Sequence, residues 1–498
     1  MIGLLAARNL TRNPWRTLFL LFGFSMGVAT MIVLLSVGEA LLDQAKDEKL
    51  VGGGSLTILP DGVDVEVMKT GGLGGMFFSI DHARFLHRQF LAAPRLRDVV
   101  SAVAPQIEGK LLYLRTSDGR ELSVRAGGDI PSLTAAVGAA PNVTSGAWVD
   151  ESLDRRWASP TMAELRHAID HFHLPAAQAR SDPSWAEWHY FNFISPDRQQ
   201  WAFVSFIAAG EVGGNGGRWG GQVLVTLHEQ GHPARRFTSA VPSSAVRFST
   251  DDANLRVGDS RVDVQPDGRY HVHAVAREEG RGTALTLDLV VSPSPGAYFP
   301  GAALTSGVIS GYVVPALRAE ATGRLCIAAS CRQYDGVQAY HDHNWGVWRG
   351  VTWEWGAARA GQYTLLYGRV EPPDSVAAVQ PLFVYLVDSS GFLAVFRPRA
   401  ISYADGRVTR VGGAAVRTPS TAEMIDIRGA DTLRVSLDIE DATATDTRGD
   451  RAERGKGLAS RGLLRPWFVQ MKGTATISGR MRGTPLAGTG AGFFETYR

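Results

Sequence analysis

The stretches "EWHYFNFIS" (Glu187–Ser195) and "QWAFVSFIAAG" (Gln200–Gly210) decide the fold class of this chain. Both are short runs rich in aromatic and β-branched residues, as β-strands usually are. Similar runs continue toward the C-terminus, among them "GQVLVTLHE", "RYHVHAVAR", "TALTLDLVVS", "GQYTLLYGRVE", "FLAVFR", "LRVSLDIE" and "GTATISGRMRG". Many short strands joined by Gly, Asp-Gly and Pro turns predict antiparallel sandwiches or barrels. The region from Trp185 onward is too long for one small barrel, so we expect two β-lobes.

Length and composition limit the number of domains and the classes of function that this chain can have. The chain has 498 residues, which predicts two or three domains. Its net charge is only +2, so overall charge gives no indication of nucleic-acid binding. We expect no nucleic-acid partner. An ATPase is also excluded, because the chain has no G-x-x-x-x-G-K-[ST] motif.

The N-terminal segment Thr17–Gly38 contains no charged residue over 22 positions. As a helix it would span roughly 33 Å, enough for the hydrocarbon core of a membrane. Arg8, Arg12 and Arg16 precede it, which predicts an N-terminus in the cytoplasm and a main domain outside. A cleaved signal peptide is the alternative, but its apolar region is usually shorter and no A-x-A site follows. We therefore expect a single-pass anchor in a bacterial inner membrane.

The stretch "LAARNLTRNPWRTLFLLFGFSMGVATMIVLLSVGEAL" resembles the first helix of the MacB/FtsX-type ABC transporter permeases. The later stretch "VVSAVAPQIEGKLLYLRTSDGRELSVRAGGDIP" is similar to part of their periplasmic core. A complete permease is excluded, because no later segment has 18 uncharged apolar residues in a row. The resemblance implies an ABC transporter ATPase or permease as a partner.

The only two cysteines are Cys326 and Cys331. Two thiols cannot form a four-cysteine zinc site. On the two arms of a hairpin that turns at residues 328–330 they could form a disulfide, which requires an oxidising compartment. Two free buried thiols remain an equal alternative.

The stretch "AYHDHNWG" (residues 339–346) concentrates groups that can carry chemistry. In a strand, alternate side chains point to opposite faces. One face would carry Tyr340, Asp342 and Asn344. The other would carry His341, His343 and Trp345. Alternation thus separates the histidines from the aspartate.

A metal site would need His341 and His343 together with a distant ligand. The stretch "YHVHAVARE" offers a second pair, His271 and His273, followed by Glu278, loosely like the cupin ligand pattern. The cupin glycine is missing, because Gln265 occupies its position. Histidines of strand-rich domains more often lie on polar faces or in a satisfied core, so we expect no metal and no other cofactor.

An acid/base site would need a carboxyl group in an apolar cavity, where burial raises its pKa and keeps it protonated. Asp342 is followed by four tryptophans, Trp345, Trp348, Trp353 and Trp355. If several of them faced one cavity, they would desolvate Asp342, contact an apolar ligand and stabilise a carbocation. The alternative is that the tryptophans fill a core and that Asp342 caps a turn.

The motif Y-H-D-H-N-W-G, with the tryptophan-rich strand after it, resembles the carotenoid 1,2-hydratase (hydroxyneurosporene synthase, CrtC)/AttH-like family. The stretches "SWAEWHYFNF", "GYVVPALRAEATGRL" and "GAGFFETYR" are similar to other parts of that family. The resemblance covers residues 153–498 and implies two lipocalin-like antiparallel β-barrel lobes around an apolar ligand cavity.

The resemblance also implies roles for individual residues. Asp342 would be the proton donor and Tyr340 its aid. Apart from what the resemblance implies, the residues that we predict to bind the ligand are Trp345, Trp348, Trp353, Trp355, Asn344, Trp188, Tyr190 and Tyr312. The hydratases carry a His-x-Trp pair that is not evident in the tract 311–315, which points away from carotenoid hydration and toward envelope lipids.

The expected organisation is a lead-in (1–16), a transmembrane helix (17–38), a small α+β permease-like segment (39–152) and two lobes (153–347 and 348–498). The expected function is binding of a long apolar, isoprenoid or lipid-like molecule, with hydration, isomerisation or cyclisation started by protonation from Asp342. The alternative is a non-enzymatic lipid-binding module of an ABC-type export system.

Overall fold

The computed structural model describes residues 14–47, 99–138, 149–159, 169–175, 181–212, 218–304, 310–372, 381–411, 414–446 and 466–498, with positions 56, 58, 83, 86–87, 90, 95–96 and 164. The chain divides into two compact units. One comprises Met1–Ser79 and Val100–Trp157, and the other comprises Ile80–Val99 and Ala158–Arg498. Most of the predicted lead-in, residues 1–13, lies outside the described residues.

The first unit contains helix α2 (Pro14–Asp47), the hairpin of β1 (Gln106–Arg115) and β2 (Glu121–Asp129), and helix α5 (Pro131–Ala136). Helix α6 (Ser152–Ala158) follows at its C-terminal end. In the described part of the chain, no helix combines the length and the apolarity that a membrane crossing requires. The segment 17–38, predicted to be a transmembrane helix, lies within α2 and does not meet this requirement.

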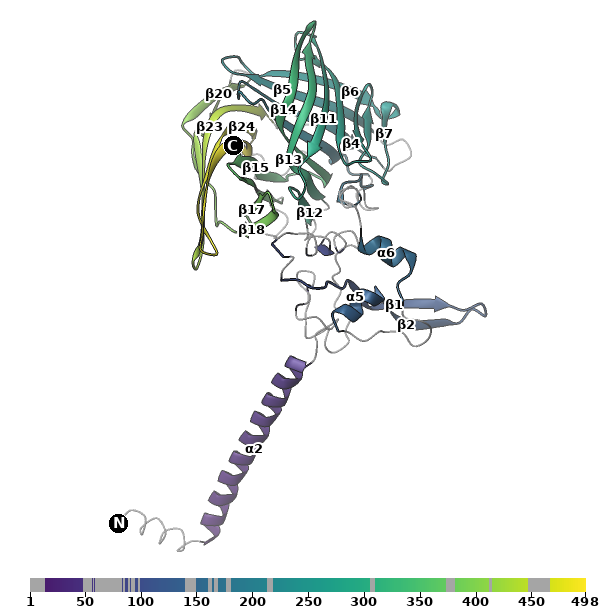
Figure 1. Cartoon of the computed structure of the whole chain (residues 1–498), viewed down its shortest axis with the longest axis vertical. Helices are drawn as coiled ribbons and strands as arrows, with labels where there is room; N and C mark the ends of the chain where they lie inside the picture. The colour runs from purple at the N-terminus through teal and green to yellow at the C-terminus, as the bar shows by residue number, and fades with distance from the viewer. Residues whose placement is uncertain are drawn as a thin grey trace, which may run out of the picture. The chain divides into compact units, whose positions relative to one another are not determined.

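The second unit is built on two large antiparallel sheets, as predicted for a mainly β protein (Figure 1). The first sheet comprises β3 (Trp185–Ile194), β4 (Gln200–Gly210), β5 (Trp219–Glu229), β6 (Arg235–Pro242), β7 (Val246–Phe248), β8 (Leu255–Val257), β9 (Ser260–Val264), β10 (Tyr270–Glu278), β11 (Ala284–Pro293), β12 (Phe299–Leu304), β13 (Ser310–Ile327) and β14 (Ser330–Val347). A short 3₁₀ helix, η2 (Ser243–Ala245), lies between β6 and β7.

The first sheet closes on itself. Its strands run in the order β11-β13-β14-β3-β4-β5-β6-β10, and β10 also pairs with β11 along Tyr270–Arg277. Closure leaves no free edges along this ring and creates an interior. Apolar side chains such as Phe191, Phe206 and Leu287 fill that interior and are completely buried.

The second sheet is a curled, open sheet in the green and yellow part of Figure 1. Its order is β18-β17-β16-β15-β25-β24-β23-β22-β19. Its strands are β15 (Thr352–Ala360), β16 (Tyr363–Glu371), β17 (Phe383–Asp388), β18 (Gly391–Phe396), β19 (Ser402–Ala404), β22 (Thr421–Arg428), β23 (Asp431–Asp446), β24 (Trp467–Met481) and β25 (Thr484–Tyr497). A separate hairpin pairs β20 (Arg407–Val411) with β21 (Ala414–Thr418). The sheet has its own core, which includes Leu365, Val435 and Phe494.

A third apolar cluster joins the outer face of the first sheet to the second sheet. Tyr190 and Tyr340 contribute to it from β3 and β14, while Trp355 and Phe493 contribute from β15 and β25. Because side chains alternate along a strand, β3 and β14 supply one set of residues to the ring interior and the other set to this cluster. Both faces are therefore buried over His189–Ile194 of β3 and Ala339–His343 of β14.

The turn between β13 and β14 carries the two cysteines. Cys326 lies opposite Cys331 in the register of the two strands, and the structure joins them in a disulfide. The bond closes the far end of the long β13–β14 hairpin.

Candidate functional site

A cavity of about 280 Å³ lies between the two sheets of the second unit. Strands of both sheets contribute to its wall, so neither sheet forms it alone. Its lining residues are Ala186, Trp188, Tyr190, Ser205, Ile207, Tyr312, Asp342, Asn344, Trp348, Trp353, Trp355, Val370, Phe468, Gln470 and Glu495. The wall is mainly aromatic, with a few polar groups among the rings, as is usual for pockets that bind small apolar molecules.

Most of the predicted ligand-binding residues meet at this cavity. Trp188 packs against Trp348 at 4.7 Å between ring centroids, and Trp348 packs against Trp353 at 5.9 Å. Tyr312 meets Trp355 edge to face at 5.0 Å. These contacts fix the rings with respect to one another and form a largely apolar wall.

The position of the Trp355 ring requires a glycine on the neighbouring strand. Gly368 faces Trp355 across the β15–β16 pair, and a Cβ atom at this position would come within 2.5 Å of the indole ring. A larger residue at 368 would therefore displace Trp355. The indole Nε1 of Trp355 donates a hydrogen bond of 2.9 Å to the hydroxyl of Tyr340.

Trp345 does not line the cavity, although it is among the predicted ligand-binding residues. It lies on the opposite face of β14, where its ring stacks on His173 with 3.8 Å between centroids. Strand alternation accounts for this difference, because Trp345 is one position away from Asn344, which does line the cavity.

Asp342 is the polar centre of the cavity wall and is 4% exposed. Its Oδ2 accepts a hydrogen bond of 2.7 Å from Tyr340, and its Oδ1 accepts one of 2.6 Å from Asn344. Burial raises the pKa of Asp342 to about 7, and the negative charge of Glu495 adds to this effect, while the two hydrogen bonds oppose it. A carboxyl group with this pKa can carry its proton near neutral pH.

Glu495 is a second buried carboxyl group at the same cavity. Trp353 donates a hydrogen bond of 2.9 Å to its Oε2, and Gln470 donates one of 3.1 Å to its Oε1. Burial raises the pKa of Glu495 above its usual value. Glu495 is not among the site residues predicted from the sequence. The only feature of the nearby sequence that could have indicated Glu495 is the presence of an acidic residue within the largely apolar stretch "GAGFFETYR".

The histidines of the 339–346 stretch lie on the other face of β14, inside the closed first sheet. His343 pairs with two carboxylates, through Nδ1 to Asp170 Oδ1 at 2.6 Å and through Nε2 to Glu187 Oε1 at 3.0 Å. Burial disfavours its charged form, but the two carboxylates outweigh burial and raise the pKa of His343 to about 9. His343 is therefore a charged member of a buried network.

The second His-x-His pair does not join this network. His271 and His273 both pair with Asp288 on the neighbouring strand β11, at 2.9 and 3.2 Å. Glu278 instead accepts two hydrogen bonds from Arg235, at 3.0 and 2.8 Å. The three residues of the cupin-like pattern thus do not converge on one point.

Comparisons with known proteins give structural matches only. A scan against family models and a search of curated proteins both return no match. A candidate AttH from Nitrosomonas europaea matches with a TM-score of 0.44 and 14% identity, over 66% of this chain and 98% of that one. Kievitone hydratase from Nectria haematococca gives 0.39 and 12%, over 66% and 94%. CghA in complex with Sch210972 gives 0.39 and 15%, over 63% and 89%.

The chain is thus similar in structure to an AttH-like protein, a hydratase and CghA, each at low sequence identity. The resemblance of the N-terminal segment to MacB/FtsX-type permeases finds no support in these comparisons.

Proposed function

We propose that this chain binds an apolar, isoprenoid or lipid-like molecule in the cavity between its two sheets and protonates it from Asp342. The observation that carries the proposal is a buried carboxyl group, with a pKa raised to about 7, in the wall of a largely aromatic cavity. A general acid is most effective when its pKa lies near the working pH. Asp342 meets that condition.

The hydrogen bonds from Tyr340 and Asn344 leave other hydrogen-bonding positions of the Asp342 carboxyl group available for its proton. Each carboxyl oxygen can take part in two hydrogen bonds, and Tyr340 and Asn344 occupy one position on each oxygen. One remaining position can carry the acidic hydrogen toward the ligand. Tyr340 and Asn344 are thus positioning residues that orient the carboxyl group.

The proposed step is proton transfer to a carbon–carbon double bond. The O–H bond of Asp342 breaks, the π electrons form a new C–H bond, and the adjacent carbon becomes a cation. The faces of Trp348, Trp353 and Trp355 can stabilise that cation through their π electrons. Water or a second double bond of the ligand then supplies the electron pair, and the proton that is released returns to the Asp342 carboxylate. Hydration and cyclisation both balance in this way without an oxidant.

The size of the cavity limits what reacts inside it. At about 280 Å³ its volume is just below the usual range for ligand pockets, roughly 300–1,000 Å³. It therefore accommodates a small apolar ligand or one end of a longer chain. A reaction at a terminal double bond fits this size better than one in the middle of a long chain.

The test is deuterium incorporation in D₂O by the full chain, with a panel of isoprenoid alcohols that carry a terminal double bond. Mass spectrometry of the recovered ligand detects a new C–D bond whether the product is hydrated or cyclised. Asp342→Asn should lower the rate by about 10² to 10⁴-fold and leave binding intact. Full activity of this variant on a converted substrate would refute the mechanism.

The second candidate function is a lipid-binding module without catalysis, working beside an ABC-type export system. The absence of a His-x-Trp pair in the tract 311–315 favours it. Native mass spectrometry of the purified full chain separates the two functions. A retained ligand that stays unchanged after prolonged incubation supports a carrier, and a ligand that gains water or deuterium supports an enzyme.

Membrane attachment is a separate proposal. Its support is the uncharged segment Thr17–Gly38 and the exposure of large apolar side chains along α2, including Phe19, Phe22 and Phe24. Large apolar side chains are usually buried away from water. A lipid environment would therefore stabilise those that α2 exposes. Membrane fractionation of cells that express the full chain tests this. Recovery in the membrane fraction after alkaline carbonate washing supports it, and recovery in the supernatant rejects it.

A further inference from the structure

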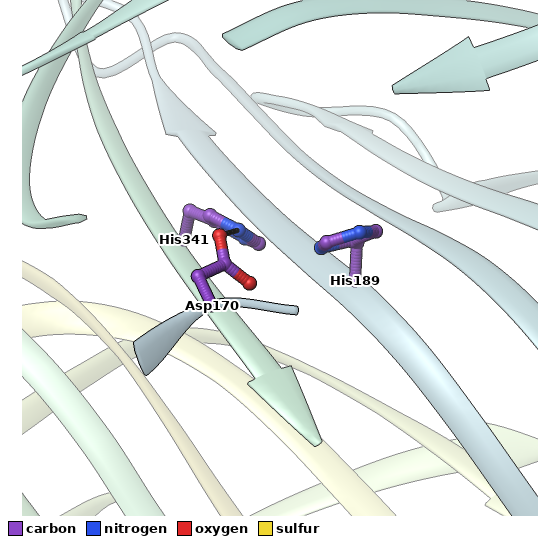
Figure 2. Close-up of side chains that lie close together, drawn as sticks. All are labelled: Asp170, His189 and His341. Atoms are coloured by element: carbon purple, nitrogen blue, oxygen red, sulfur yellow. Dashed lines mark ion pairs between the residues drawn. The ribbon is translucent and has the colours of Figure 1, made fainter. Parts of the chain in front are cut away.

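A second cluster of polar side chains lies inside the closed first sheet, on the face of β14 opposite to Asp342. It comprises Asp170, His189 and His341, whose exposed fractions are 2%, 0% and 0%. Each offers one ligand atom, and these atoms lie within 4.8 Å of one another. Figure 2 shows the Asp170 carboxylate beside the His341 ring, with the His189 ring across from it. Apolar residues such as Phe172 and Phe191 pack around this cluster.

Both imidazole rings are oriented by backbone carbonyls. His189 Nε2 is 2.8 Å from the carbonyl oxygen of Ala253, and His341 Nδ1 is 3.0 Å from that of Tyr190. Because a carbonyl oxygen only accepts hydrogen bonds, each of these nitrogens carries the hydrogen, and in the neutral ring the other nitrogen carries a lone pair. Those other atoms, His189 Nδ1 and His341 Nε2, have no hydrogen-bond partner among the described residues.

The carboxylate of Asp170 is held in a similar way. His343 Nδ1 lies 2.6 Å from its Oδ1, and the hydroxyl of Tyr270 donates to its Oδ2. His341 Nε2 lies 3.7 Å from the same Oδ2, which is too long for a hydrogen bond. The three groups are therefore fixed by neighbours but are not hydrogen-bonded to one another.

We propose that Asp170, His189 and His341 bind a divalent transition-metal ion, with zinc as the preferred ion. Two neutral imidazoles and one carboxylate form a donor set suited to zinc and to its neighbours in the first transition row. Metal-binding histidines usually donate their other ring N–H to a carbonyl or carboxylate, as His189 and His341 do here. A fourth position would remain for water.

The separations of the ligand atoms are compatible with such an ion. Zinc ligands lie about 2.0–2.2 Å from the metal, which in a tetrahedral site places them about 3.3–3.6 Å apart. The His341–Asp170 separation of 3.7 Å is close to this value, and the widest separation, no more than 4.8 Å, would have to shorten by up to about 1.5 Å when the ion binds. Without an ion, two buried lone pairs would stay without a partner, which destabilises a folded protein.

This site differs from the histidine pair that the sequence suggests as metal ligands. His341 combines with His189 of the neighbouring strand β3, and His343 instead orients Asp170. Asp170 belongs to the segment 169–175 that precedes β3, so the ion would join this segment to β3 and β14. We assign it a structural role, separate from the acid at Asp342.

Zinc content of the full chain tests the proposal. The chain is incubated with excess zinc sulfate, passed through a desalting column and measured by inductively coupled plasma mass spectrometry. The unmodified chain should retain about one zinc per chain, while His189→Gln and His341→Gln should each retain about tenfold less. His271→Gln is the matched control and should retain zinc, because His271 pairs with Asp288 away from this cluster.

Cobalt substitution provides a second measurement that does not depend on the variants. Co²⁺ bound by nitrogen and oxygen ligands in a four- or five-coordinate site gives visible absorption bands, and added zinc should abolish them. Circular dichroism shows whether each variant is folded. The proposal is wrong if the unmodified chain retains no zinc and gives no cobalt bands, or if folded His189→Gln and His341→Gln variants retain zinc as the unmodified chain does.

Discussion

The hydroxyl group of Tyr340 donates a hydrogen bond of 2.7 Å to Oδ2 of Asp342, two residues further along β14. The same hydroxyl accepts a hydrogen bond from Trp355, a residue of the second sheet. One short chain of contacts thus fixes the buried acid to both sheets. It also makes the pKa of Asp342 sensitive to individual neighbours, which can be removed one at a time.

Replacing Tyr340 with phenylalanine should raise the pKa of Asp342. The hydrogen bond from Tyr340 favours the carboxylate and lowers this pKa from the value that burial alone would give. The pH above which proton-donating activity declines, expected near 7, should therefore move upward in Tyr340→Phe. The variant Tyr334→Phe removes a buried hydroxyl that binds Gln200, away from Asp342, and should leave the profile unchanged. A downward shift in Tyr340→Phe would contradict this account.

Replacing Glu495 with glutamine should have the opposite effect. The negative charge of Glu495 disfavours a second charge at Asp342 and raises its pKa. In Glu495→Gln the pKa of Asp342 should therefore fall. A ¹³C NMR titration of the aspartate carboxyl signals, assigned with Asp342→Asn, measures this without any substrate. An unchanged Asp342 titration in Glu495→Gln would show that the two carboxyl groups do not interact.

Asp342 should make the folded chain less stable as pH rises. Its folded pKa of about 7 lies above the usual value of 3.8, so the folded state binds more protons than the unfolded state between these values. Between pH 5 and pH 8 this group alone should lower the free energy of unfolding by up to about 3 kcal/mol, at about 1.4 kcal/mol per pKa unit. Urea unfolding of the unmodified chain and of Asp342→Asn at both pH values measures the effect. The variant should lose that part of the pH dependence, and equal slopes for the two proteins would rule it out.

Trp348 and Trp345 form a matched pair for ligand binding. Trp348 lines the cavity, whereas Trp345 packs on the opposite face of β14 against His173. With retinol as a fluorescent isoprenoid probe, Trp348→Leu should weaken binding by about tenfold, because a large apolar contact is lost. Trp345→Leu should bind retinol with the affinity of the unmodified chain. If Trp345→Leu weakened binding as much as Trp348→Leu, the cavity would not be the binding site.

Local sequence patterns account for the features that depend on near neighbours along the chain. Short aromatic and β-branched runs predict a mainly β protein, because such side chains suit a pleated surface. The two-residue period of a strand places Tyr340, Asp342 and Asn344 on one face, and the structure has this arrangement. The same period places Trp345 on the opposite face, where it contacts His173. The prediction of Trp345 as a ligand-binding residue was therefore inconsistent with this period.

The distant residues that meet these faces depend on the tertiary structure. Glu495 lies more than 150 positions after Asp342 in the sequence, and it reaches the cavity because β25 pairs with β15 in the second sheet. Asp170 reaches His341 because β3 and β14 are neighbours in the closed first sheet and the segment before β3 enters its interior. Strand pairing and ring closure depend on contacts between residues that are far apart in the sequence. The two-residue alternation of side chains along a strand carries no information about these contacts. The alternation along a strand thus fixes the face on which each side chain lies. The pairing of strands fixes which distant side chains lie against that face.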